Sequence, residues 1–325
     1  MTPDVSILVV SYNTRELTLA CLRSIAHETT RPHEVIVVDN ASTDGSPAAI
    51  RAEFPGVTLI EPGANLGFAA ANNLAARHAN APLLLLLNPD TVVLDRAIDT
   101  LTEFTHAHPD ASIFGGRTLR EDRTLDPVCV MGMPSTWSFL CEGVGLNHLF
   151  ARTRLFDPIS FGPWKRDSVR RVPVITGAFL MIRRDLWSTL AGMDERFFLY
   201  CEEVDLCMRA RELGHSCEFC PGAEIVHLGS ASQRVRADRF VRTQRAKAQL
   251  IRKHFRPPAR ELSLFFLALR VWTRRVASRM LGVALPRYRD PSREWREIWN
   301  RRREWLDEHP LATAPRPAHA TEPRT

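Results

Sequence analysis

The sequence lacks the glycine-rich turns with which two common nucleotide-binding folds hold phosphate. The apolar run Val5–Val10 is followed by Ser11–Thr14, which contains no glycine. A dinucleotide site needs glycine in that turn, so that the pyrophosphate can approach the next helix closely. The pattern G-x-x-x-x-G-K-[ST] is also missing. These absences argue against a nicotinamide or flavin oxidoreductase and against a P-loop phosphotransferase.

Long apolar runs are missing as well. A membrane-spanning helix needs roughly 20 apolar residues, and the longest candidate, Leu262–Leu269, is much too short. The first apolar run has no basic segment before it, which predicts a strand and not a signal peptide.

The seven cysteines are an odd number and are scattered along the chain. This usage predicts a reducing compartment, the cytoplasm, and mostly buried thiols. Cys217 and Cys220 form a C-x-x-C, but no second pair follows at zinc-site spacing and Pro221 comes next. We therefore predict that both are core residues.

The composition is that of a folded globular enzyme, with 45% hydrophobic and 25% charged residues in 325. We predict an α/β domain over residues 1–233, a basic helical extension over 234–309 and a disordered tail over 310–325.

Short β-branched or leucine-rich runs alternate with helical stretches in the first hundred residues. Strands are predicted at 5–10, 34–39, 57–62 and 82–88, with helices at 15–27, 46–53 and 68–79. This alternation is typical of βαβ units that build a mostly parallel sheet covered by helices on both faces.

Polar residues follow each of these strands. Ser11–Thr14, Asp39, Asn65 and Asp90 all come after strand ends, which lie on one edge of a parallel sheet. For any one of them, a helix cap or a turn is an equally good explanation. As a set they predict a binding crevice, in which Asp39 could accept hydrogen bonds from a ribose or a base.

Seven segments in order carry a resemblance to a known family. They are VSILVVSYNT, EVIVVDNASTDGS, NLGFAAANN, LLLLNPD, GAFLMIRRDLW, GMDERFFLYCEEVDLCMR and HLGSAS. Together they resemble the family 2 glycosyltransferases, specifically the rhamnosyltransferase-like branch, over about residues 5–235. The resemblance implies the GT-A fold, a Rossmann-like, mostly parallel sheet flanked by helices, here with a C-terminal helical extension.

The implied activity is transfer of a sugar, with inversion, from a nucleotide-diphosphate donor to an acceptor hydroxyl. The expected sugar is L-rhamnose from dTDP-rhamnose, and the expected acceptor is a glycan or lipid-linked oligosaccharide of cell-surface polysaccharide synthesis. Two alternatives stay open, a UDP- or GDP-hexose donor and a non-catalytic nucleotide-sugar binding protein.

The leaving diphosphate needs positive charge, from a divalent cation or from fixed cationic groups. The family's metal motif is two aspartates separated by one residue, and here it reads Asn88, Pro89, Asp90. The resemblance implies Mg or Mn on Asp90, with His227 completing the site. A structural strand-end histidine is the alternative for His227.

The resemblance also implies a general base at the helix start YCEEVDLC, where the family usually has Glu-Asp-Val-Asp. We expect Glu203 to be the base, with Glu202 as second candidate. Simple stabilisation of a helix N-terminus is the alternative, above all for Asp205 and Glu202.

The other implied roles belong to donor and acceptor binding. The donor residues are Tyr12, Asn13, Thr14, Asp39, Asn40, Ser42, Asn65, Gly67, Asn72 and Asn88. Gly177 and Ala178 leave room for the sugar and acceptor, and Asp194, Glu195, Phe197 and Phe198 form part of the acceptor wall.

The net charge is +6, and the excess of basic over acidic residues is concentrated beyond residue 230. The run from 233 to 256 is either a solvated helix face or the source of Arg234 or Arg236 for the donor diphosphate. No nucleic-acid recognition pattern accompanies it, so we expect no nucleic-acid partner.

A last helix is expected after Asp290, with Asp290 as N-cap and Pro291 at its first position. One face of it carries Trp295, Ile298, Trp299, Trp305 and Leu306. The sequence leaves open whether this face lies on an anionic membrane or on the protein's own core. A membrane contact would place the protein peripherally, at the inner face of the cytoplasmic membrane.

Overall fold

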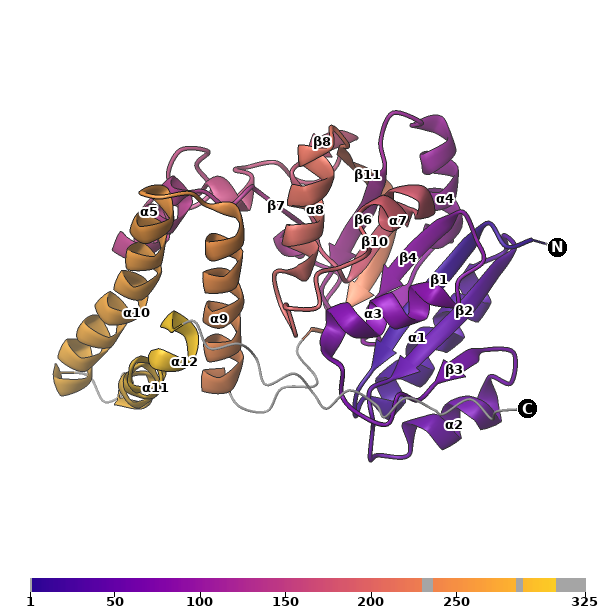
Figure 1. The fold of residues 1–325 in the computed structure, drawn as a ribbon, viewed down its shortest axis with the longest axis horizontal. Helices are drawn as coiled ribbons and strands as arrows, with labels where there is room; N and C mark the ends of the chain where they lie inside the picture. Colours follow the sequence, from indigo (N-terminus) through magenta and orange to yellow (C-terminus); the bar gives the residue numbers. More distant parts are fainter. Residues whose placement is uncertain (1, 230–235, 285–288, 308–325) are drawn as a thin grey trace, which may run out of the picture.

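The computed structural model describes residues 2–229, 236–284 and 289–307. Its main sheet has nine strands in the order β3-β2-β1-β4-β10-β6-β11-β5, with β8 paired to β11 (Figure 1). The predicted boundary at residue 233 and the predicted disordered tail lie outside the described residues.

The first half of the sheet is the predicted parallel βαβ arrangement. It contains β1 (Val5–Ser11), β2 (His33–Asp39), β3 (Thr58–Ile60) and β4 (Leu83–Leu87), connected by α1 (Arg15–Glu28), α2 (Ser46–Glu53) and α3 (Gly67–Arg77). Adjacent strands pair in parallel, and Ser11 at the end of β1 is level with Asp39 at the end of β2. The predicted convergence of these strand ends is confirmed.

The leucine run of β4 is buried on both faces of the sheet. Leu84 and Leu86 belong to one core cluster, and Leu83, Leu85 and Leu87 belong to the other. A central strand covered on both sides cannot alternate apolar and polar residues, which explains five consecutive leucines.

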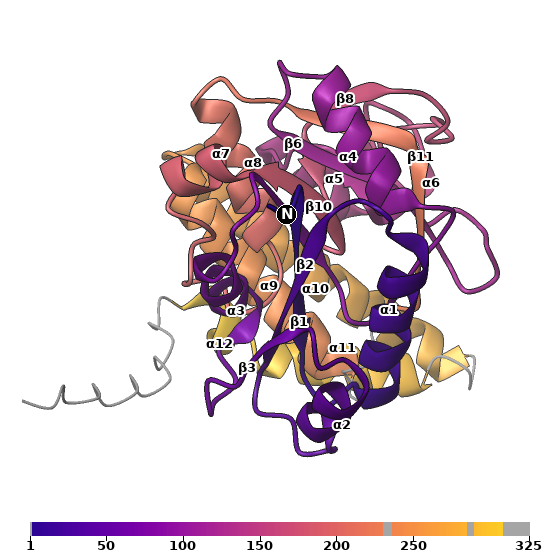
Figure 2. The same cartoon turned by 90° about the vertical axis from the view of Figure 1, so that its right-hand side faces the viewer.

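Helices cover both faces, as Figure 2 shows with α1 on one side of the sheet and α3 and α8 on the other. One core cluster lies between the sheet and α1, α2 and α4 (Ala97–Ala107). The other contains residues of α3, α7 (Arg184–Thr189) and α8 (Glu202–Glu212). The cysteines Cys217 and Cys220 are buried, as predicted.

The second half of the sheet is mixed. β10 (Phe179–Arg183) is antiparallel to both β4 and β6 (Ile113–Leu119), and β11 (Cys217–His227) is antiparallel to β5 (Thr91–Val93). β8 (Arg170–Val172) pairs with β11, and a small second sheet joins β7 (Val130–Met131) to β9 (Val174–Ile175). Short elements complete this part, namely η1 (Pro127–Cys129), α5 (Thr136–Val144), α6 (Leu146–Leu149) and η2 (Pro158–Ser160).

The C-terminal helices form a layer beside the sheet domain, with α9 between that domain and α10 (Figure 1). They are α9 (Arg236–His254), α10 (Ala259–Ala284), α11 (Arg289–Asn300) and α12 (Arg303–Leu306). Ala246 and Leu250 of α9 belong to the main core, whereas Val241 and Ile251 belong to a separate cluster with α10 and α11. No described helix is long and apolar enough to cross a membrane.

The tryptophan-bearing helix lies on the protein's own core. Ile298 and Trp305 are fully buried, and Trp295 and Trp299 pack against the same cluster. Of the two readings left open by the sequence, the structure therefore supports core packing for this face. The helix begins at Arg289, so Asp290 lies in its first turn and is not the predicted N-cap.

Candidate functional site

A cavity of about 680 Å³ opens at the carboxyl edge of the parallel strands. Its lining comes from the loops after β1, β2 and β4, the start of α8, and the helices α5 and α9. The cavity is thus the predicted crevice, closed on one side by the C-terminal helical layer.

Six of the expected donor residues line the cavity. They are Tyr12, Thr14, Asn40, Asn65, Gly67 and Asn88. Gly177 and Ala178 line it too, as expected.

Four expected donor residues do not line the cavity, and for Asn13 and Ser42 the reason is structural. The backbone N–H of Asn13 donates to Ser42 Oγ at 2.8 Å, and Asn13 Oδ1 accepts from the backbone N–H of Thr43 at 2.8 Å. These bonds join the first loop to the second. Both side chains thus position the loops whose neighbours line the cavity.

Asp39 and Asn72 lie behind the cavity wall and are almost fully buried. Asp39 Oδ1 accepts from the backbone N–H of Ser42 at 2.7 Å, and Asn72 Nδ2 donates to the carbonyl of Phe68 at 2.9 Å. Asp39 Oδ2 and Asn72 Oδ1 have no partner among the described residues. A buried acceptor without a donor is costly, and no hydrogen bond from the described residues offsets that cost at either oxygen.

Gly67 is fixed by a close approach of two segments. Its φ is +80°, and a Cβ there would lie 2.3 Å from the carbonyl oxygen of Phe198. The same carbonyl accepts from the backbone N–H of Phe68 at 2.8 Å. Only glycine fits this conformation and this space, which hold the start of α3 against the segment before α8.

Asp90 and His227 meet across the β5–β11 pair. Thr91 pairs with His227, which brings Asp90 Oδ1 to 3.3 Å from His227 Nε2, and Asn88 Nδ2 lies 3.3 Å from the same nitrogen. Burial alone would lower the His227 pKa, but the hydrogen bond and charge of Asp90 outweigh it and raise the pKa above its ordinary value.

A carboxylate and an imidazole that both line the cavity are suitable ligands for a hard divalent cation. Within the described part of the chain, no group of three His, Cys, Asp or Glu side chains forms a complete metal site. The residues fit an ion that takes its remaining ligands from a bound phosphate and from water.

The two glutamates are presented by a sharp turn. Tyr200 and Cys201 have φ of 76° and 66°, and α8 begins directly after them at Glu202. Such non-glycine backbone costs of order 1–3 kcal/mol per residue, and it persists where the surroundings fix it. The turn directs the N-terminus of α8 into the cavity, where Glu202 and Glu203 both form part of the lining.

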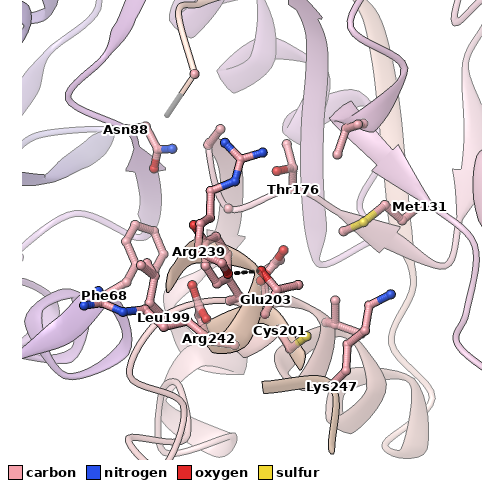
Figure 3. A pocket seen from close by; sticks show the side chains of 18 of the residues that line it. Phe68, Asn88, Met131, Thr176, Leu199, Cys201, Glu203, Arg239, Arg242 and Lys247 are labelled. Carbon is pink, nitrogen blue, oxygen red and sulfur yellow. Dashed lines mark hydrogen bonds between the residues drawn. The ribbon is translucent and has the colours of Figure 1, made fainter. Parts of the chain in front are cut away.

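The two carboxyl groups differ in burial. Glu202 is 4% exposed, and its Oε2 has no partner in the described residues. Burial, and then the charge of Glu203, raise the Glu202 pKa well above its ordinary value, while burial raises the pKa of Glu203. Burial therefore favours the neutral form of both carboxyl groups, and like charge beside it adds to this effect at Glu202. Figure 3 shows Glu203 in the centre of the view, between Asn88 and Lys247.

Asp205 lies in the first turn of α8, where its carboxylate pairs with cationic side chains and makes no capping hydrogen bond. It is fully buried and pairs with Arg209 at 2.8 Å, His254 at 2.7 Å and Lys253 at 2.5 Å. Burial opposes its ionisation, but these partners hold its pKa below the ordinary range. This cluster ties α8 to α9.

The expected acceptor wall is only partly correct. Phe198 lines the cavity, whereas Asp194, Glu195 and Phe197 do not. Asp194 pairs with Lys253 at 2.6 Å, and Glu195 Oε1 accepts from Asn73 Nδ2 at 3.0 Å. Asp194 and Glu195 therefore bond to other parts of the protein and do not face the cavity.

Cationic side chains of α9 reach the cavity, and sequence reasoning did not single them out. Arg239, Arg242 and Lys247 line it (Figure 3). Lys247 pairs with Glu142 at 2.9 Å, whereas the described residues give neither Arg239 nor Arg242 an acidic partner. The predicted Arg234 lies outside the described residues, as does the side chain of Arg236.

Comparisons with known proteins agree with this geometry. The family model "Glycosyl transferase family 2" matches residues 6–161. An N-acetylglucosaminyl-diphospho-decaprenol L-rhamnosyltransferase of Mycobacterium tuberculosis is 30% identical over 246 residues, which are 70% of this chain and 76% of that protein. The rhamnosyltransferase WbbL of Escherichia coli is 25% identical over 187 residues, covering 54% and 65% of the two chains.

A mannosyltransferase from Pyrobaculum calidifontis, solved with GDP-Man and Mn²⁺, has a similar structure. The TM-score is 0.59 with 19% identity, and the match covers 95% of this chain and 89% of that one. This likeness shows the GT-A fold. The chain therefore belongs to glycosyltransferase family 2, in its rhamnosyltransferase-like branch, and is a glycosyltransferase.

Proposed function

We propose that the protein transfers L-rhamnose from dTDP-rhamnose, with inversion, to a hydroxyl of a lipid-linked glycan in cell-surface polysaccharide synthesis. The Mycobacterium and Escherichia relatives are both rhamnosyltransferases, which supports the sugar, and the decaprenyl diphosphate substrate of the first supports a lipid-linked acceptor. Such an acceptor would place the enzyme peripherally at the inner face of the cytoplasmic membrane.

The reaction needs one base. The acceptor oxygen attacks the anomeric carbon, the bond from that carbon to the diphosphate oxygen breaks, and the hydroxyl proton goes to the base. The single observation that carries this proposal is the pair of cavity-lining carboxyl groups at the start of α8, both with pKa values raised by burial. Glu203 accepts the proton as a carboxylate, and neutral Glu202 beside it adds no second charge.

The nucleotide would lie over the first two strand ends. Tyr12, Thr14 and Asn40 line that part of the cavity, and the free oxygen of Asp39 lies behind it. A carboxylate there accepts hydrogen bonds from ribose or base. Gly67 lines the same cavity, and its close contact with Phe198 fixes the backbone that the donor would meet there.

The diphosphate would lie near Asp90 and His227, which would hold Mg or Mn. When bound, this ion offsets the charge that develops on the leaving diphosphate. Asn88 replaces the family's first aspartate, so this chain has one anionic ligand fewer for the metal. Arg239 and Arg242 line the same cavity and supply fixed positive charge.

The test is a donor panel with the purified protein. Transfer from dTDP-rhamnose, dTDP-glucose, UDP-hexoses and GDP-mannose to an N-acetylglucosaminyl diphosphoryl lipid is measured with and without Mn²⁺ or Mg²⁺, alongside thermal shifts. Among these donors, we expect only dTDP-rhamnose to give both turnover and a rise in melting temperature. Turnover with a UDP- or GDP-hexose would contradict the proposed donor, and binding without any turnover would favour a non-catalytic role.

A further inference from the structure

One face of α10 is apolar, and most of its side chains are exposed. Its side chains recur at intervals of three or four positions and form the α10 stripe, namely Leu262, Phe265, Leu269, Trp272, Val276 and Met280. Leu262, Phe265, Trp272 and Met280 are 47%, 59%, 45% and 69% exposed. A continuous apolar face of this kind on a folded protein indicates a binding surface.

The stripe is not the face that packs on the protein. Ser263, Leu267, Val271 and Ser278 are buried, and through this opposite side α10 contacts α5, α9 and α11. In Figure 1, α10 is the outermost helix of the molecule, on the side away from the sheet. The helix is therefore apolar on two sides, and only one of them is covered.

A basic hollow borders the stripe. Arg275 and Arg279 of α10 and Ser292 and Arg296 of α11 line a second cavity of about 290 Å³. No acidic side chain is paired with any of these three arginines in the described ranges. Arg275 and Arg279 follow Trp272 and Val276 by three positions, which makes them neighbours of the stripe on the helix surface. Three guanidinium groups and a hydroxyl around one hollow are suited to a phosphate group.

We propose that the α10 stripe and this hollow form a docking surface for an anionic phospholipid bilayer. The stripe enters the boundary between headgroups and acyl chains, and the hollow holds a lipid phosphate. Tryptophan, phenylalanine and leucine on one side of a helix with arginine at its edge are the pattern of an interfacial helix. Of the five arginines of α10, Arg260 and Arg270 pair with glutamates, and the other three add attraction to a negative surface.

The surface lies in the same helical layer as the glycosyltransferase cavity. α10 packs along α5, and Ser138, Phe139 and Glu142 of α5 line the cavity. Glu142 pairs with Lys247 of α9 at 2.9 Å and with Arg270 of α10 at 2.6 Å, which joins the three helices. The role of this surface in catalysis rests on the proposed function, because it assumes a lipid-linked acceptor. Binding of the surface to lipid does not depend on that function.

The experiment is sedimentation of the full chain with vesicles of phosphatidylcholine, alone or mixed with phosphatidylglycerol. We expect binding to the mixed vesicles that weakens as salt is raised. The double variant Phe265→Ser with Trp272→Ser should bind about tenfold more weakly or worse, because two inserted aromatic side chains are lost. Arg279→Gln with Arg296→Gln should lose the preference for phosphatidylglycerol.

Matched controls come from the ends of α8 and α3, outside α10 and α11. Leu213→Ser removes an apolar side chain of similar exposure, 55%, and Arg77→Gln removes an exposed arginine outside the hollow. Both should sediment like the wild type. Circular dichroism, and unchanged transfer to a short-chain, water-soluble acceptor, would show that the stripe and hollow variants are folded.

Three results would overturn the proposal. The first is a wild-type protein that does not sediment with the mixed vesicles at low salt. The second is a stripe variant that binds as well as Leu213→Ser. The third is a dimer in solution that the stripe variant dissociates, without any vesicle binding, since the partner would then be a second copy. If vesicle binding is found without sugar transfer, the proposed function fails and the surface stands.

Discussion

Replacing Glu203 by glutamine should abolish turnover and leave donor binding intact. The change keeps the size and the polar atoms of the side chain but removes the group that accepts the proton. General base catalysis contributes about 10²–10⁴-fold, or about 3–5 kcal/mol of barrier at 1.36 kcal/mol per factor of ten. We expect kcat/KM to fall by that range, with an unchanged thermal shift by dTDP-rhamnose.

The pH profile gives an independent readout. Glu203 acts as the carboxylate, so the rate should fall as pH drops through its pKa. Because burial raises that pKa above the ordinary value of about 4.3, the fall should begin at a higher pH than for an exposed carboxylate. In Glu203→Gln, the rate should not show this fall at acidic pH. The assay is release of dTDP during single-turnover transfer across acidic to neutral pH.

Glu202→Gln is the matched control. In the proposed mechanism Glu202 keeps its proton, and glutamine resembles a neutral carboxylic acid, so we expect a loss of less than about tenfold. If Glu202→Gln abolishes turnover while Glu203→Gln does not, the roles are exchanged. An acidic limb that persists in Glu203→Gln at a measurable rate would refute the reasoning.

Three further substitutions test the metal site, the contact between Gly67 and Phe198, and the α8–α9 connection. Asp90→Asn should remove any metal-dependent rise in melting temperature and lower kcat/KM by about 10²–10³-fold, since the diphosphate charge is less well offset. Gly67→Ala should lower the melting temperature and weaken donor binding, because its Cβ would lie 2.3 Å from the Phe198 carbonyl oxygen; an unchanged melting temperature would contradict the close approach. Asp205→Asn should cost about 3–5 kcal/mol in urea unfolding near neutral pH, because it leaves buried cations without their partner. Since the Asp205 pKa is lowered in the folded state, its stabilisation is present above the unfolded pKa and is lost as pH falls, so wild type and variant should converge in acid.

The parallel half of the fold was predictable because strand ends carry their own signal. Leu83–Leu87 is apolar at every position, which identifies a buried strand, and Asn88 and Asp90 follow where it ends. The antiparallel insertion of β10 was not predictable in the same way, since its register depends on contacts more than ninety residues apart in the chain, such as Phe179 with Leu87.

Within the site, the sequence identified the loops that line the cavity. It did not distinguish the residues that line the cavity from those that only hold these loops in place. Asn13 and Ser42 have the same residue types as true lining residues, yet they bond to each other's loops. Arg234 and Arg236, the cationic residues expected at the diphosphate, stay a prediction because their side chains lie outside the described residues. Arg239 and Arg242 reach the cavity because α9 packs against the core through Ala246 and Leu250, and this orientation is set by tertiary contacts.

The C-terminal helices show what an amphipathic pattern leaves undecided. In α11, a single apolar face with Trp295 and Ile298 fitted a membrane and a core equally well, and a core covers it. In α10, the run Leu262–Leu269 leaves too few polar positions for one face to be solvated. A helix that is apolar on two sides needs a partner on each side. The fold supplies α5, α9 and α11 for one side, and the arginines beside the other indicate that its partner is anionic.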